Sequence, residues 1–269
     1  MFHSTIPEQI ASIPLNRKMP GLVFNWEQVA GLQGVKQIRS LESIEFDEIP
    51  ENTAVEFEPD TFIVLGKKLG EGKQGIVYAV ATSPTACLKI GRNEKSAKQF
   101  RRELLGVQHY DALGVKYPEI LGADGYGRWI AKKRWRDVQN TGATALAVGR
   151  RLPDFLIRAL HRYVVKFEQT GLCADWMPSN VVFTTNGCAT FETPIWHIKS
   201  HGWTFASTFL PLWIQEGISE SILTEFPPYN WPASDIEAAR KAWATDPTYE
   251  TWRKLFGKFP KLCSEWWSL

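Results

Sequence analysis

The sequence predicts an α+β fold, with a small antiparallel β-sheet lobe followed by a mainly helical lobe. Between residues 61 and 90 the apolar residues come in short, β-branched runs separated by glycine or proline turns, which is typical of paired strands. Over residues 152–171 the apolar residues instead recur at helical spacing, the longest such pattern in the chain. With 269 residues, the chain can bury a substantial core, either as one domain or as two lobes that share a cleft.

Composition and charge give no sign of a nucleic-acid or membrane partner. The net charge is +2, and 22% of the residues are charged. No apolar run approaches the length of a membrane-spanning helix, and the first residues lack the basic-then-apolar order of a secretory signal. The four cysteines are far apart, which favours a reducing compartment. We therefore expect a cytoplasmic protein that binds neither nucleic acid nor a membrane, and we expect it to be a monomer.

A glycine-rich stretch is the most informative part of the first lobe. Three glycines follow the spacing G-x-G-x-x-G: Gly70, Gly72 and Gly75. Glycines at this spacing allow backbone N–H groups to approach phosphate oxygens. A dinucleotide-binding loop of the same spacing would open a helix, whereas residues 76–80 are strand-forming. The stretch therefore predicts strand, glycine loop, strand and a turn at residues 83–85, followed by a third strand that contains Lys89.

A helix should follow these strands. Apolar residues at helical spacing predict a helix over residues 94–105, which contains Glu103, and two more strands are expected at residues 117–121 and 128–132. Five strands and one helix would make the first lobe. The expected organisation is then an N-terminal extension over residues 1–60, a first lobe over residues 61–134 and a second lobe over residues 135–269.

A polar loop in the second lobe carries the other candidate residues. It follows the long helix at 152–171 and contains Asp175, with Asn180 five residues later at the start of a strand. Asn186-Gly187 then predicts a two-residue hairpin that leads to a partner strand over residues 188–192.

These two stretches resemble the protein kinase-like superfamily. The glycine loop, the Val77 that follows it and the strand lysine are similar to the nucleotide-covering hairpin of protein kinases. Asp175 followed by Asn180 resembles the catalytic loop of that superfamily, and aminoglycoside and choline phosphotransferases have the same signature with a proline where Pro178 stands. The resemblance implies a two-lobed protein kinase-like fold.

The resemblance also implies roles for individual residues, with ATP and Mg²⁺ as cofactors. Asp175 would orient the attacking hydroxyl, and Lys89 would grip the α and β phosphates while paired with Glu103. Asn180 and Glu192 would hold metal, Glu192 matching the metal-binding Asp of the family. The remaining positions would cover the nucleotide: Gly70, Gly72, Gly75 and Val77.

The sequence departs from the family pattern at three places. Cys173-Ala174 stand where the family often has His-Arg, so switching by a phosphorylated activation loop is not expected. Met177 replaces a common Lys or His, and Glu192 replaces Asp. The reduced second lobe is similar to the minimal kinases of bacteria or phages, including effectors that are secreted into a host cell.

We expect an ATP- and Mg²⁺-dependent kinase that acts on serine or threonine hydroxyls of a protein, with a host-cell protein among the candidate substrates. Three alternatives remain open. The chain would otherwise be a pseudokinase that binds nucleotide without transfer, a small-molecule kinase of the aminoglycoside or choline type, or a kinase-fold enzyme that transfers AMP.

Overall fold

The computed structural model describes 6–41, 49–72, 74–135, 140–141, 154–174, 180–184, 187–190 and 192–197, with a few positions between 238 and 246. These residues fall into two compact units. The first comprises Met1–Leu105 and Pro118–Arg136, and the second comprises Gly106–Tyr117 and Asp137–Leu269.

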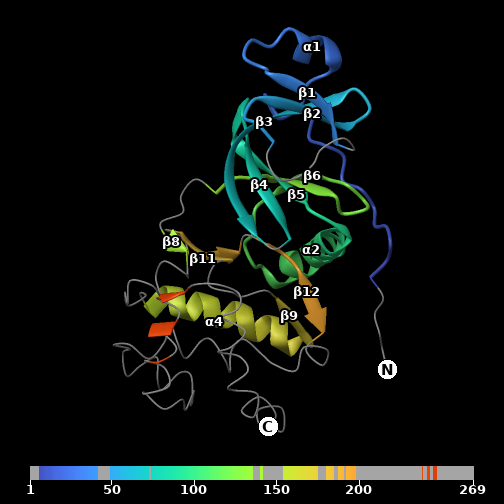
Figure 1. Ribbon diagram of the computed structural model, residues 1–269. Helices are drawn as coiled ribbons and strands as arrows, with labels where there is room; N and C mark the ends of the chain where they lie inside the picture. The colour runs from blue at the N-terminus through green and yellow to red at the C-terminus, as the bar shows by residue number, and fades with distance from the viewer. Residues whose placement is uncertain are drawn as a thin grey trace. The chain divides into compact units, whose positions relative to one another are not determined.

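A mixed sheet of seven strands forms the first unit, in the order β1-β2-β3-β4-β5-β7-β6. All neighbours are antiparallel except β1 and β2, which are parallel. The strands are β1 Gln37–Ser40, β2 Thr53–Glu58, β3 Thr61–Gly72, β4 Gly75–Val80, β5 Ser83–Gly91, β6 Ile120–Ala123 and β7 Trp129–Lys133. Figure 1 shows β3 and β4 as a long hairpin. The α+β fold class predicted from the sequence is confirmed.

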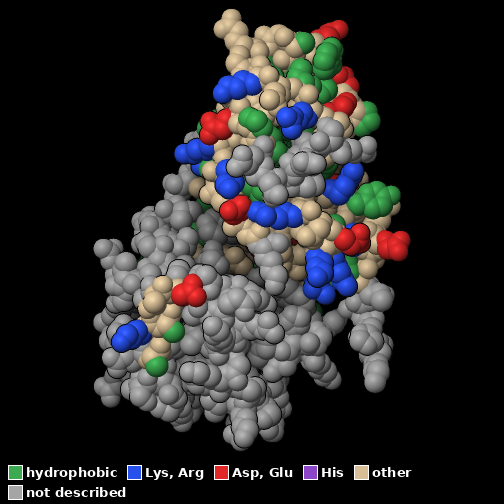
Figure 2. All heavy atoms as spheres, in the orientation of Figure 1, with side chains coloured by type: hydrophobic (Ala, Val, Ile, Leu, Met, Phe, Trp, Pro, Cys, Tyr) green, Lys and Arg blue, Asp and Glu red, His purple; other side chains and the backbone are tan. Residues whose placement is uncertain are grey.

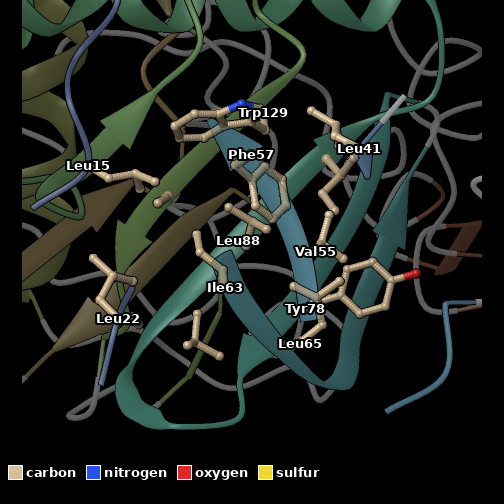
Figure 3. Packing of buried hydrophobic residues seen from close by; sticks show 14 of the residues in the cluster. Leu15, Leu22, Leu41, Val55, Phe57, Ile63, Leu65, Tyr78, Leu88 and Trp129 are labelled. Atoms are coloured by element: carbon tan, nitrogen blue, oxygen red, sulfur yellow. The ribbon is translucent and has the colours of Figure 1, made fainter. Parts of the chain in front are cut away.

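One face of this sheet carries the main apolar core. Side chains alternate between the faces of a strand, so that Leu88 and Ile90 of β5 enter this core while Lys89 points to the other face. Trp129 of β7 is fully buried there and meets the ring of Phe57 edge-on at 5.5 Å (Figure 3). The strand residues that alternate with these core residues point to the second face, where they form two smaller clusters. One cluster lies beneath a short helix α1 (Trp26–Ala30) and the other beneath α2 (Glu94–Leu113).

The N-terminal residues complete this unit. Leu15 and Leu22 are buried in the main core, and Ile13 bridges Ala123 of β6. The sequence predicted five strands in the first lobe, and this number was wrong because β1 and β2 extend the sheet from within residues 37–58. Residues before position 61 therefore supply both strands and core of the first unit.

Helix α2 is longer than the predicted 94–105. The side chain of Asn93 accepts a hydrogen bond from the backbone N–H of Ser96 at 3.1 Å and caps its start. The helix runs on to Leu113 and ends at Gly114, whose positive φ of 67° suits a helix C-terminus. Its residues up to Leu105 belong to the first unit and the rest to the second.

The turn between β4 and β5 lies two residues earlier than predicted. The sequence placed it at residues 83–85, but Ser83 already pairs with Val80, and Ala81 and Thr82 form the turn. Thr82 is held there, since its hydroxyl donates a hydrogen bond to the carbonyl of Gly21 at 2.5 Å.

The second unit is described only in part. It contains helix α4 (Asp154–Gln169) and five short strands: β8 Asn140–Thr141, β9 Leu172–Ala174, β10 Val181–Thr184, β11 Gly187–Thr190 and β12 Ile195–His197. The predicted hairpin is present as β10 paired with β11, with Asn186 outside the described residues. Phe167 of α4 is buried against the ring of Tyr110, 4.7 Å between centroids.

Surface charge in the described part is mixed. On the face drawn in Figure 2, Lys and Arg side chains lie interspersed with Asp and Glu side chains rather than as a patch of one sign. Within the described residues, no helix is both long and apolar enough to cross a bilayer.

Candidate functional site

Strand β5 places Lys89 on the face of the sheet that α2 covers. Lys89 lies directly opposite Val77 of β4 on one side and Ile130 of β7 on the other. Ile130 packs against Phe100 and Leu104 of α2. Residues directly opposite each other in a sheet share a face, so Val77, Lys89 and Ile130 form one row beside the helix.

A buried ion pair joins this strand to the helix. The ammonium of Lys89 donates a hydrogen bond to Oε2 of Glu103 at 3.2 Å, and the side chains are 9% and 0% exposed. The Lys89 ammonium also lies 4.7 Å from the ring centroid of Phe100, a cation–π distance. The sheet, the ring and the carboxylate together fix the position of the ammonium group.

A second lysine binds the same carboxylate, and sequence reasoning missed it. The ammonium of Lys132 in β7 donates a hydrogen bond to Oε1 of Glu103, and its side chain is 7% exposed. Because Lys89 is opposite Ile130 in the sheet, Lys132 is its diagonal neighbour on the same face. The signal in the sequence was a Lys-Lys pair at 132–133, but only the strand register shows which lysine points inward.

The pKa of Glu103 is lowered by these two lysines. Burial alone would raise the pKa of a carboxyl group, because it disfavours the charged form. Coulombic attraction and hydrogen bonds from Lys132 and Lys89 outweigh that effect and hold the pKa of Glu103 below its ordinary value. Glu103 is therefore an ionised carboxylate at neutral pH.

The three glycines of the β3–β4 hairpin have different surroundings. A Cβ at Gly75 would collide with the carbonyl of Ile90 and lie 3.1 Å from the Phe100 ring, so packing within the unit accounts for this glycine. At Gly70 and Gly72 a Cβ would meet nothing within 4 Å, and neither has a left-handed φ. Packing within the fold therefore requires a glycine at position 75, whereas it would allow a side chain at positions 70 and 72.

Ion pairs lie beside these open positions. Glu71 accepts from Lys68 at 3.2 Å and from Arg92 at 2.8 Å, which ties the hairpin to the end of β5. The hydrogen bond from Lys68 is the main cause that lowers the pKa of Glu71. Exposed pairs of this kind orient a loop more than they stabilise it.

The residues that sequence reasoning placed in the second unit are described unevenly. Asp175 lies outside the described residues. Asn180 directly precedes β10, and Glu192 follows β11, both half-buried. Thr193 beside Glu192 is buried, and its carbonyl occupies the space that a Cβ on Gly106 would need. Across the described residues, no group of three or more His, Cys, Asp or Glu is arranged to hold a metal ion.

The structure thus brings together some predicted site residues. Lys89, Glu103 and Val77 lie within one part of the first unit, and the β3–β4 hairpin carries the three glycines. The metal-binding roles of Asn180 and Glu192 stay predictions, as does the catalytic role of Asp175.

No protein-family model matches the chain, and no curated protein matches it in sequence. Solved structures do resemble it, and these are protein kinases and kinase-fold enzymes, the superfamily that the sequence resembles. The kinase domain of PknI from Mycobacterium tuberculosis is 18% identical over 49% of this chain and 58% of that one, with a TM-score of 0.33. Vaccinia related kinase 3 is 15% identical over 55% and 52%, with a TM-score of 0.38.

A third neighbour is APH(2'')-IIia, whose structure is a complex with GDP and kanamycin. It is 16% identical over 38% of this chain and 35% of its own, with a TM-score of 0.31. The chain therefore spans between 35% and 58% of the length of these three proteins. Such partial likenesses identify no substrate or activity for this chain.

Proposed function

We propose that this protein is an ATP-dependent phosphotransferase that transfers the γ-phosphate to a serine or threonine hydroxyl of a protein. The observation that carries the proposal is the buried Lys89–Glu103 pair on the sheet that also bears the glycine hairpin. An ammonium group has three N–H donors, so a lysine that a carboxylate holds in place is suited to grip phosphate oxygens.

The glycine hairpin supports a nucleotide as the ligand. Gly75 is accounted for by packing, but the space at Gly70 and Gly72 is open on the folded chain. A side chain at either position would cost the fold nothing sterically, whereas it would obstruct a phosphate group that approaches the backbone. The need to leave room for a phosphate group therefore explains the glycines at these two positions better than packing within the fold does.

The proposed chemistry combines these parts with the resemblance. The substrate hydroxyl oxygen forms a bond to the γ-phosphorus, the bond to the β–γ bridging oxygen breaks, and ADP leaves. Lys89 would hold the α and β phosphates so that the leaving group is fixed, while Asp175 would receive the hydroxyl proton. Mg²⁺, when bound, neutralises charge on the phosphates, and Asn180 and Glu192 are its proposed ligands.

Protein is the proposed substrate because of the composition of the chain after Glu192. Kinases of the aminoglycoside or choline type usually have an acidic, helical region there, whereas residues 193–269 of this chain are nearly balanced in charge and rich in aromatic side chains. A small-molecule kinase, an AMP transferase and a pseudokinase remain as outcomes of the experiment.

The proposal is tested with γ-labelled ATP, Mg²⁺ and a mixture of candidate proteins, using the wild type, Lys89→Met and Asp175→Ala. We expect label on protein with the wild type and a loss of roughly a hundredfold or more with either variant. Lys133→Met is the matched control, because Lys133 is an exposed strand lysine paired with Glu119.

The other outcomes separate the alternatives. Label transfer that persists in both variants would contradict the proposal. Labelled metabolites without labelled protein would indicate a small-molecule kinase, and a gain of a nucleotide in the intact mass of the target would indicate AMP transfer. Thermal stabilisation by nucleotide without turnover would indicate a pseudokinase.

A further inference from the structure

The cluster around Glu103 contains a second lysine in addition to the predicted pair. Lys89 donates to one oxygen of Glu103 and Lys132 to the other, and each lysine side chain is less than one tenth exposed. The three side chains together carry one net positive charge in a buried position.

Folding energetics alone do not account for Lys132. A buried ammonium group is costly to remove from water, and an apolar residue of similar volume beside a neutral Lys89–Glu103 pair would be at least as favourable for folding. Two lysines that are diagonal neighbours on one sheet face also repel each other. A role in holding the carboxylate of Glu103 accounts for a lysine at this position.

We infer that Lys132 is a positioning residue of the nucleotide site. By holding Oε1 of Glu103 it keeps Oε2 on Lys89, and this fixes the orientation of the Lys89 ammonium and hence the direction of its N–H groups. The Phe100 ring limits the ammonium on another side. The inference rests on the proposed function, because it takes ATP phosphates as the anion that Lys89 binds.

Lys132 also keeps Glu103 ionised. The charged groups that lower the pKa of this carboxylate are Lys132 of β7 and Lys89 of β5, and Cys87 of β5 is a titratable neighbour. Without Lys132, only Lys89 would oppose the effect of burial, which favours the neutral carboxyl group, so the pKa of Glu103 would rise. Glu103 would then become protonated at a higher pH and release its hold on Lys89.

The experiment measures binding of fluorescent methylanthraniloyl-ATP with Mg²⁺ to the full chain from about pH 3 to about pH 8, so that the range includes the acid side of the ordinary carboxyl pKa. Four proteins are compared: the wild type, Lys132→Met, Lys132→Arg and the neighbouring exposed control Lys133→Met. For Lys132→Met we expect about tenfold weaker binding at neutral pH, and we expect the acid midpoint at which binding is lost to move to higher pH. Lys132→Arg should recover most of the affinity, and Lys133→Met should behave as the wild type.

Two results would overturn the inference while leaving the proposed function intact. One is wild-type affinity and an unmoved acid midpoint in Lys132→Met. The other is a Lys132→Met protein that does not fold, since this would show that the fold itself requires the lysine. If the wild type does not bind the nucleotide, the proposed function fails first and the inference with it, so the two failures are distinguishable.

Discussion

Glu103 is the single residue on which the geometry of the candidate site depends most. It is fully buried, and it is bound by two lysines from two different strands. Because its pKa lies below the ordinary value of 4.5, its ionised form stabilises the folded state. This contribution is present above about pH 4.5 and is lost as the pH falls through the pKa of the folded protein.

Glu103→Gln should therefore destabilise the protein strongly at neutral pH. An amide in place of the carboxylate removes the negative charge that both buried ammonium groups bind, so we expect a loss of about 3–5 kcal/mol in the free energy of unfolding. Urea denaturation at about pH 7 and about pH 4 measures it, and the difference from wild type should shrink at the lower pH.

Glu119→Gln is the matched control for this prediction. Glu119 pairs with Lys133 at 3.2 Å, but both side chains are more than half exposed, so the change should cost less than about 1 kcal/mol. Equal losses of unfolding free energy in the two variants would show that the buried Glu103 contributes no more to stability than the exposed Glu119.

Tyr117 makes a second pH-dependent contribution. Partial burial is the largest cause that raises its pKa to about 12, followed by a hydrogen bond from its hydroxyl to Asp111 at 2.8 Å. The unfolded chain loses the phenolic proton first, near the ordinary value of 10, so the contribution is complete below that pH. It is lost as the pH rises towards about 12.

Asp111→Asn should lower the pKa of Tyr117 towards its ordinary value, because it removes the negative charge beside the phenol. Titration of tyrosinate absorbance, compared between wild type, Asp111→Asn and Tyr117→Phe, identifies the transition that belongs to Tyr117. An unchanged late transition in Asp111→Asn would show that burial alone raises this pKa.

At the scale of elements, the β3–β4 hairpin combines positions that serve the fold with positions that remain open. Gly75 lies against β5 and α2, whereas Gly72 faces free space. The same substitution at the two positions should therefore affect different properties of the protein.

Gly75→Ala should lower the free energy of unfolding by about 1–3 kcal/mol, because the new methyl group collides with the β5 backbone at Ile90. Gly72→Ala should leave stability nearly unchanged and instead weaken nucleotide binding by about tenfold, equivalent to about 1.4 kcal/mol. Thermal unfolding and nucleotide titration of both variants check this. Unimpaired nucleotide binding in Gly72→Ala would contradict a role of the open hairpin in holding phosphate.

Most elements around the hairpin could be predicted from the sequence, because their apolar patterns are strong and their partners are close along the chain. Residues 62–65, 76–80 and the start of α2 at Glu94 are examples. The Lys89–Glu103 pairing came from the resemblance to kinases, since helical spacing alone marks Glu103 only as one acid among several.

Other features depend on contacts that no local pattern reveals. Strand β1 is mostly exposed and polar, so that only its pairing with β2 defines it as a strand. Likewise, the inward direction of Lys132 is set by the register between β5 and β7. Helix α2 continues past Leu105 through a glycine, Gly106, whose missing side chain makes room for the Thr193 carbonyl.

At the scale of the whole molecule, the N-terminal residues are integral to the unit that carries Lys89. Leu22 is fully buried in the main core of the sheet, and the backbone N–H of Asn16 donates to the carbonyl of Leu121 at 2.7 Å. The predicted boundary at residue 61, the monomeric state and secretion into a host cell stay predictions.

Leu22→Ala should lower the free energy of unfolding by about 2–5 kcal/mol, because it leaves a cavity in the core of the sheet. Leu105→Ala is the matched control, since this leucine on α2 is 39% exposed, and its replacement should change stability by no more than about 0.5 kcal/mol. Chemical denaturation of both variants measures the difference. A loss in Leu22→Ala no larger than in the control would mean that the N-terminal residues are dispensable for the core.

The bridge between Ile13 and Ala123 also constrains when this unit can form during synthesis. After their synthesis, residues 10–16 must wait for the segment around β6 before their backbone finds its partners at residues 121–125. Closing so long a loop slows folding and prolongs the exposure of apolar strands. The nascent protein is therefore expected to depend on chaperones until β6 and β7 have emerged.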